Sequence, residues 1–82
     1  MPTVARIGAL QVVIYPNDHR PAHVHVKGGG CEAVFNLHCP DGPPALRENF
    51  GFSLAQVNRI ITAIVVELES LCTQWGKFHE GD

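Results

Sequence analysis

The chain has 82 residues, of which 45% are hydrophobic and 17% are charged, and its net charge is -2. This composition excludes an intrinsically disordered chain, and the slightly negative charge argues against a general nucleic-acid-binding protein. A chain of this length makes one small domain, so we expect a single domain over residues 1–82. Within it, residues 1–51 form a β-rich part and residues 52–82 form a C-terminal helix with a short tail.

The cysteines bear on the cellular compartment. Cys31, Cys39 and Cys72 form no C-x-x-C pair, and an odd number of cysteines is a poor basis for the disulfide framework of a secreted protein. No stretch approaches the ~20 apolar residues that a membrane span needs. The sequence therefore predicts a cytoplasmic protein with reduced thiols and no membrane partner.

The N-terminal segment predicts a β-hairpin. The stretches TVARI and LQVVIY are rich in β-branched residues and flank Gly8-Ala9, which suits a tight turn. Pro16, Asn17 and Asp18 then end the second strand, because proline removes a backbone donor and the other two residues favour turns. The predicted opposite pairs are Ile7 with Leu10, Ala5 with Val12 and Thr3 with Ile14.

A second hairpin follows, with alternating apolar and polar residues on both sides of the GGG stretch at residues 28–30. Side chains alternate between the two faces of a strand, so each segment has one row on each face. The apolar rows are Ala22, Val24 and Val26 before the glycines and Ala33, Phe35 and Leu37 after them. The opposite rows are His23, His25 and Lys27 before the glycines and Glu32, Val34, Asn36 and His38 after them.

The register of this hairpin depends on which glycines form the turn. A two-residue turn at Gly28-Gly29 keeps both apolar rows on one face, and so does a four-residue loop, whereas a three-residue loop needs a bulge. The favoured opposite pairs are Val24 with Ala33, His25 with Glu32 and His23 with Val34.

The last third of the chain has the period of an α-helix. The proline- and glycine-rich segment before it predicts an irregular surface segment, with a short extended piece at Ala45–Glu48. Ser53 and Gln56 make a capping box and Gly76 suits a C-terminal cap, so we expect one helix over residues 53–75. The apolar residues at helical spacing are Leu54, Val57, Ile60, Ile61, Ile64, Leu68, Leu71 and Trp75.

These elements predict an α+β fold, in which an antiparallel sheet of about four strands packs on one long C-terminal helix. A helix of ~23 residues is about 35 Å long, whereas strands of ~6 residues span about 20 Å, so we expect the helix to overhang the sheet. The overhanging apolar stripe predicts a homodimer or a partner that docks on this helix. The competing arrangement is a diagonal crossing, in which the twisted sheet and residues 39–52 cover the whole stripe.

Several stretches resemble a known family. MPTVARI, YPNDHRPAHVHV, EAVF and a closing helix with a tryptophan near its end resemble, over nearly the whole chain, the small bacterial proteins named domain of unknown function 4160. The shared core is Asp-His-x-Pro-x-His-Val-His, and many members have a second proline where this chain has Ala22. The resemblance implies a partner protein encoded nearby and a part in a toxin-antitoxin module. It implies no role for any single residue, because the family has no settled catalytic residues.

The histidine segment suggests acid-base chemistry. Imidazole exchanges protons near neutral pH, and a carboxylate opposite it, as Glu32 is opposite His25 in the favoured register, can orient the ring. Cleavage of RNA through the 2'-hydroxyl needs a base, an acid and a cation, so one hypothesis is a metal-independent ribonuclease. Its candidate catalytic residues are His25, Glu32, His23, His19 and Arg20, and its candidate substrate-binding residues are Lys27, Asn36 and Asp18.

The same segment also fits a metal site. His23 and His25 are spaced as an H-x-H ligand pair on one strand face. The candidate third ligands are His19, Glu32 and His38. H-x-H alone is a weak signal, and structural zinc sites more often use cysteines, so we expect no metal and no cofactor.

The alternative hypothesis is a noncatalytic module that binds a protein or a nucleic acid and regulates it. Histidines on the open face of a sheet can simply be exposed to solvent, and residues 18–21 favour a turn. Under either hypothesis we expect the polar face of the second hairpin to be the exposed working surface. The expected partners are RNA or a cognate small protein.

Overall fold

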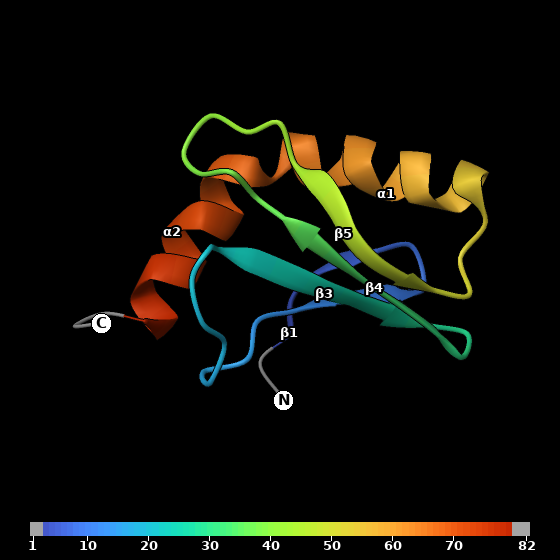
Figure 1. Cartoon of the computed structure of the whole chain (residues 1–82), viewed down its shortest axis with the longest axis horizontal. Helices are drawn as coiled ribbons and strands as arrows, with labels where there is room; N and C mark the ends of the chain where they lie inside the picture. The colour runs from blue at the N-terminus through green and yellow to red at the C-terminus, as the bar shows by residue number, and fades with distance from the viewer. Residues whose placement is uncertain (1–2, 80–82) are drawn as a thin grey trace.

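The computed structural model describes residues 3–79 and confirms the α+β class (Figure 1). A five-stranded antiparallel sheet, in which every strand pairs with its neighbour in sequence, is followed by two helices. The strands are β1 (Thr3–Ile7), β2 (Leu10–Val13), β3 (His23–Gly28), β4 (Cys31–Asn36) and β5 (Ala45–Phe50), and the helices are α1 (Leu54–Val66) and α2 (Leu68–Phe78). The extended piece expected at Ala45–Glu48 is therefore a full edge strand. In this described part, neither helix is long and apolar enough to cross a membrane.

The first hairpin forms around Gly8 as predicted, with one correction. Ile7 pairs with Leu10 and Ala5 pairs with Val12, but Thr3 pairs with Val13. The register shifts between Thr3 and Ala5, so the predicted pairing of Thr3 with Ile14 is wrong. An irregularity of this kind adds a residue to one strand and is common at the edge of a sheet, where β1 lies.

The second hairpin has the predicted faces but a different register. The turn consists of Gly29 and Gly30, both with positive φ angles of 58° and 79°, as a tight two-residue hairpin turn requires. Gly28 belongs to β3 and pairs with Cys31, so the partners are shifted by two positions from those expected. The observed pairs are Val24 with Phe35, His25 with Val34 and His23 with Asn36.

Contact between hairpins explains this choice of turn. A Cβ atom on Gly28 would lie 2.5 Å from Leu10 Cδ2 and 3.4 Å from Leu10 Cα, so the start of β2 approaches β3 closely at this glycine. The GGG stretch alone cannot show this contact, because it involves a strand far away in the sequence. A shift of two residues preserves which face each side chain occupies, so the predicted faces survive the error in register.

The C-terminal helix is broken. The capping box of Ser53 with Gln56 begins α1 as expected, but α1 ends at Val66 and a second helix begins at Leu68. Gly76 lies inside α2, which ends at Phe78 with His79 as the C-cap, so the predicted cap at Gly76 is also wrong.

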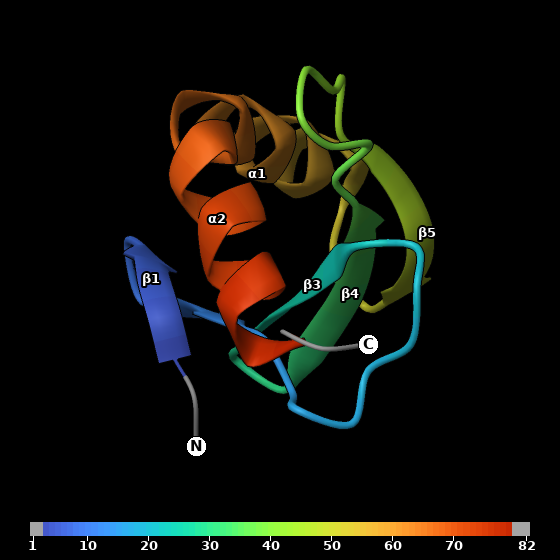
Figure 2. The same ribbon diagram turned by 90° about the vertical axis from the view of Figure 1, so that its left-hand side faces the viewer.

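The break keeps the apolar stripe on the sheet. A straight helix would extend beyond strands of four to six residues, whereas the bend at Glu67 lets α2 turn down across the end of the sheet (Figure 1). The sheet curves around both helices, with β1 and β5 at its two edges (Figure 2). Burial of apolar side chains thus outweighs the cost of interrupting the helix, since tertiary packing supplies most helical stability.

The core lies between the sheet and the helices. Its sheet residues include five from the two predicted apolar rows, Val24, Val26, Ala33, Phe35 and Leu37. Its helical residues are Val57, Ile60, Ile64, Leu68, Leu71 and Trp75. The predicted stripe is therefore intramolecular core, as in the diagonal crossing, and not an overhanging surface. Leu54 is the exception, because 76% of its surface is exposed.

A disulfide joins α2 to the segment that follows β4. Cys39, just after β4, is bonded to Cys72 of α2 across 33 residues, and Cys31 is a free cysteine. The expectation of three reduced thiols is therefore wrong for this pair. Cysteine spacing could not reveal the bond, because the two residues meet only when α2 folds back over the end of the sheet.

Candidate functional site

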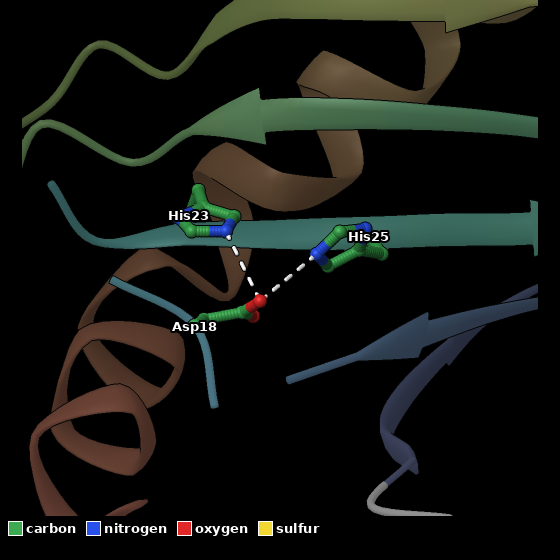
Figure 3. A group of neighbouring side chains, drawn as sticks. All are labelled: Asp18, His23 and His25. Carbon is green, nitrogen blue, oxygen red and sulfur yellow. Dashed lines mark hydrogen bonds and ion pairs between the residues drawn. The ribbon is translucent and has the colours of Figure 1, made fainter. Parts of the chain in front are cut away.

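A carboxylate and two imidazoles meet on the sheet face opposite the helices (Figure 3). Asp18 Oδ1 lies 3.5 Å from His23 Nε2 and 3.4 Å from His25 Nε2. We call Asp18, His23 and His25 the histidine centre. Only 14%, 7% and 17% of these three side chains are exposed, so the centre is largely shielded from water.

The loop between β2 and β3 brings Asp18 to the histidines. Pro16 ends β2 pairing, and the chain turns so that the Asp18 N–H donates to the Tyr15 carbonyl at 3.0 Å. The Tyr15 N–H in return donates to Asp18 Oδ2 at 3.2 Å. One carboxylate oxygen is thus held by the backbone, and the other faces the two imidazoles.

The strand β3 positions both histidines, because residues two apart on a strand share a face. His23 Nδ1 lies 2.8 Å from the Pro21 carbonyl oxygen, an atom that only accepts hydrogen bonds, so Nδ1 carries the proton of a neutral ring. His25 Nδ1 lies 3.4 Å from Glu32 Oε2. That second contact is an ion-pair distance without hydrogen-bond alignment, and His25 Nδ1 has no hydrogen-bond partner in the described part.

Tyr15 and Lys27 extend the centre along the same face. The Tyr15 ring meets the His25 ring edge-on, with centroids 4.8 Å apart. Lys27 Nζ donates to the Tyr15 hydroxyl at 2.8 Å, and this hydrogen bond raises the pKa of Lys27 above its ordinary value. The Lys27 ammonium is therefore a fixed positive charge beside the centre.

The loop also buries this face of the sheet. His23 is 6% exposed, and Val13 and Val34 on the same side are buried too, so the face is not the open surface that the sequence suggested. The loop folds back over β3 and converts a polar strand face into a second, small interior.

The other predicted site residues lie outside the centre. His19 is exposed on the loop, and Arg20 lies over the ring of Trp75 in α2, with Cζ 5.5 Å from the ring centroid. Asn36 is the cross-strand partner of His23, and its buried Oδ1 has no hydrogen-bond partner among the described residues. His38 is exposed and contacts the Pro43 carbonyl through Nδ1. The structure thus joins Asp18, His23, His25, Glu32 and Lys27, and leaves His19, Arg20 and His38 apart.

Comparison with protein families decides the relationship. The family model described as Domain of unknown function (DUF4160) matches residues 10–76, which is most of the chain. This chain belongs to the DUF4160 family. Comparisons with curated proteins and with solved structures give no match.

In this DUF4160 domain, sequence reasoning missed the part that Asp18 and Tyr15 play. The sequence made Asp18 only a candidate for substrate binding and gave Tyr15 no role, whereas Asp18 joins the two histidines and Tyr15 holds it there. A signal was present in the YPND stretch, because proline followed by Asn-Asp predicts a tight turn. A turn at that point reverses the chain toward β3 and brings an aspartate close to the histidines.

Proposed function

We propose that this DUF4160 protein is one member of a bacterial two-protein module of the toxin-antitoxin kind, and that its histidine centre cleaves RNA. One observation carries the chemical part: two imidazoles and a carboxylate lie within 4.8 Å of one another in a shielded position. Groups that take up and release protons near neutral pH are the usual agents of phosphodiester cleavage. The resemblance to small proteins encoded beside a partner supports the modular part.

Each step of the reaction has a candidate group. His25, as a neutral ring, takes the proton of the 2'-hydroxyl, whose oxygen attacks the phosphorus. His23, protonated at both ring nitrogens, gives its Nε2 proton to the leaving 5'-oxygen and becomes neutral. Glu32, 3.4 Å from His25 Nδ1, orients the base, and Lys27 lies beside the centre as the cation for the phosphate. Arg20 and His19 take no part in this arrangement, because the structure does not bring them to the centre.

The proposal places the protein in the cytoplasm, where RNA is found. Glutathione and thioredoxin keep cytoplasmic thiols reduced, whereas the structure joins Cys39 and Cys72 in a disulfide, which argues against this location. The cytoplasmic location is therefore testable through the redox state of this pair in cells.

A second candidate function is a noncatalytic module that binds its partner through exposed apolar side chains. Leu54 and Val66 of α1 are 76% and 78% exposed, and Phe50 of β5 is 61% exposed. Large exposed apolar side chains of this kind favour a partner protein or a second copy of the chain. Under this proposal the histidine centre stabilises the loop and does no chemistry.

Incubation of the tag-free protein with RNA separates the two functions. We expect cleavage that falls at least ~100-fold in His25→Ala, the effect of removing a general base. His38→Ala, which removes an exposed histidine outside the centre, serves as the matched control and should cleave normally. RNA that stays intact both with a chelator and with added divalent metal, together with retained partner binding, would establish the noncatalytic module.

A further inference from the structure

We propose that the histidine centre is a binding site for a divalent transition metal, with Zn²⁺ as its ion and Asp18 Oδ1, His23 Nε2 and His25 Nε2 as its protein ligands. From the sequence we considered His19, Glu32 and His38 as third ligands, and we expected no metal. The structure supplies a different third ligand, Asp18, from the loop over β3. This proposal concerns binding, and it uses the same Nε2 atoms that would act as base and acid in the proposed RNA cleavage, so zinc bound here would block that cleavage.

The positions of the protons are the first argument. The Pro21 carbonyl accepts from His23 Nδ1, and the Glu32 carboxylate lies beside His25 Nδ1, so both rings are oriented with Nδ1 outward toward acceptors. In a neutral imidazole whose Nδ1 carries the hydrogen, Nε2 presents a lone pair. His23 therefore directs a lone pair at Asp18 Oδ1, and the two repel unless positive charge lies between them. His25 Nε2 lies at a long hydrogen-bond distance, 3.4 Å, from the same oxygen.

The distances indicate what supplies that charge. A charge-assisted hydrogen bond between an imidazolium and a carboxylate is about 2.7–2.9 Å long, whereas the two contacts here measure 3.5 and 3.4 Å. In a tetrahedral zinc site with bonds of about 2.0–2.1 Å, neighbouring ligand atoms are roughly 3.3–3.4 Å apart. Both contacts to Asp18 match the edge length of such a tetrahedron, and the one from His25 is also a long hydrogen bond.

The surroundings are those of a metal site as well. Carbonyl and carboxylate acceptors on the outer nitrogen of ligand histidines fix the ring orientation and raise ligand basicity. The Pro21 carbonyl occupies this position for His23, and Glu32 lies near it for His25, 3.4 Å from Nδ1 without a hydrogen bond. The Tyr15 N–H holds Asp18 Oδ2, which leaves Oδ1 free to bind. The centre is also largely buried, so the ligands lose little hydration when an ion enters.

The ligand set selects the kind of ion. Two imidazoles and one carboxylate suit zinc and other first-row divalent metals, whereas Mg²⁺ and Ca²⁺ prefer ligands that are all oxygen. Three protein ligands leave a coordination position for water, as in catalytic rather than structural zinc sites. Asn36, the neighbour of His23 on the same face, has a buried Oδ1 without a partner in the described part, and this oxygen could accept a hydrogen bond from such a water.

Zinc titration of tag-free, chelator-treated protein tests the proposal, with a chromophoric chelator as the competitor. We expect one Zn²⁺ per chain, with an affinity at least ~100-fold lower in Asp18→Asn and His25→Ala and ~10-fold lower in Glu32→Gln. His19→Ala and His38→Ala remove histidines outside the centre and should bind zinc as the wild type does. Parallel titrations with Fe²⁺, Mn²⁺ and Mg²⁺ show which ion the centre prefers, and a preference for Mg²⁺ would contradict the ligand assignment.

Cobalt gives a readout that does not depend on variants. Co²⁺ bound to wild-type protein should show the intense visible absorption of a four-coordinate site, and X-ray absorption should show two imidazole ligands. Absence of stoichiometric binding at micromolar zinc would overturn the proposal, as would an unchanged affinity in Asp18→Asn. Because no RNA is present, these results stand apart from the ribonuclease test. RNA cleavage that persists in excess chelator while zinc fails to bind would refute the metal site and keep the proposed function.

Discussion

The two faces of the sheet are built on different principles. The face toward the helices is covered by side chains at helical spacing, such as Ile60, Ile64 and Leu71, and its buried side chains form one apolar cluster. The opposite face of β3 is covered by a short loop and contains charged and polar groups in fixed positions. Both faces are buried around the histidines, although only the first has a hydrophobic core.

This difference separates stability from function in a small domain. The apolar face supplies the free energy of folding, since burial of apolar surface is the dominant favourable contribution. The polar face costs stability, because a buried imidazole or carboxylate loses hydration that its partners must replace. A chain of 82 residues has little stability to spare, so a buried polar cluster that adds little stability is a strong candidate for the functional site.

The largest effect on stability is expected from shortening a side chain in the apolar core. Leu71→Ala should lower the free energy of unfolding by about 2–5 kcal/mol, because the side chain is 1% exposed and leaves a cavity among core residues. Leu54→Ala makes the same chemical change at a position that is 76% exposed, and it should change stability by less than about 0.5 kcal/mol. Urea unfolding of both variants measures the difference. Equal losses would mean that α2 does not pack on the sheet as described.

Reduction of the disulfide should have the next largest effect. A crosslink that closes a loop of 33 residues is expected to stabilise by at most about 3–4 kcal/mol, since it restricts the unfolded chain. Thermal unfolding with and without reductant should therefore give a lower midpoint for reduced wild type and for Cys72→Ser, and the two should agree. Cys31→Ser removes the free cysteine and should leave the response to reductant intact. Identical midpoints with and without reductant would show that the helices need no covalent link.

Two adjacent valines test whether the polar face is truly an interior. Val12 points to the helices and pairs with Val26, whereas Val13 points to the histidines and pairs with His25, and both are at most 1% exposed. Val13→Ala should cost roughly 2 kcal/mol, as Val12→Ala should, from about 0.8 kcal/mol per buried carbon plus a cavity term.

An exposed valine provides the control for this pair. Val66→Ala, at a position that is 78% exposed, should cost nothing in the same urea titration. If Val13→Ala behaves like Val66→Ala and not like Val12→Ala, the loop does not cover this face in solution.

The apolar face could be predicted from the sequence, because periodicity is a local property. Alternation placed Val24, Val26, Ala33 and Phe35 under the helix, and helical spacing identified the residues that cover them, with Leu54 as the one error. The break at Glu67 could not be predicted in this way. No glycine or proline marks it, and it follows from the length of the sheet relative to the helix.

The polar face was predicted only in part. The spacing of His23 and His25 placed them on one side of β3, but their partner Asp18 arrives through a loop whose path depends on tertiary contacts. The register that decides which groups face His25 depends on the close approach of Gly28 to Leu10. Local patterns thus identify faces, whereas the composition of the site requires contacts between distant segments.

The smallest effect is expected at the edge of the polar face, where Lys27 meets Tyr15. The hydroxyl of Tyr15 accepts a hydrogen bond from Lys27, and this contact raises the pKa of Lys27 above its ordinary value of 10.5. A lysine pKa that is higher in the folded state stabilises the fold fully at pH values below 10.5. That contribution is lost as the pH rises through the folded-state pKa. Because the ammonium group is exposed to solvent, the effect on stability should be slight, and the titration itself is the better measurement.

Nitrogen NMR of the lysine side chains can follow that titration. Tyr15→Phe removes the acceptor and should lower the pKa of Lys27, while Lys77 in α2, on another part of the molecule, should titrate identically in both proteins. The substitution keeps the aromatic ring that packs edge-on against His25, so the histidine centre should keep its geometry. An unchanged Lys27 titration in Tyr15→Phe would mean that Tyr15 and Lys27 do not meet in solution. The loop would then lack this link to β3, and the shielding of the histidine centre would depend on the contacts of Asp18 and Pro21 with the histidines.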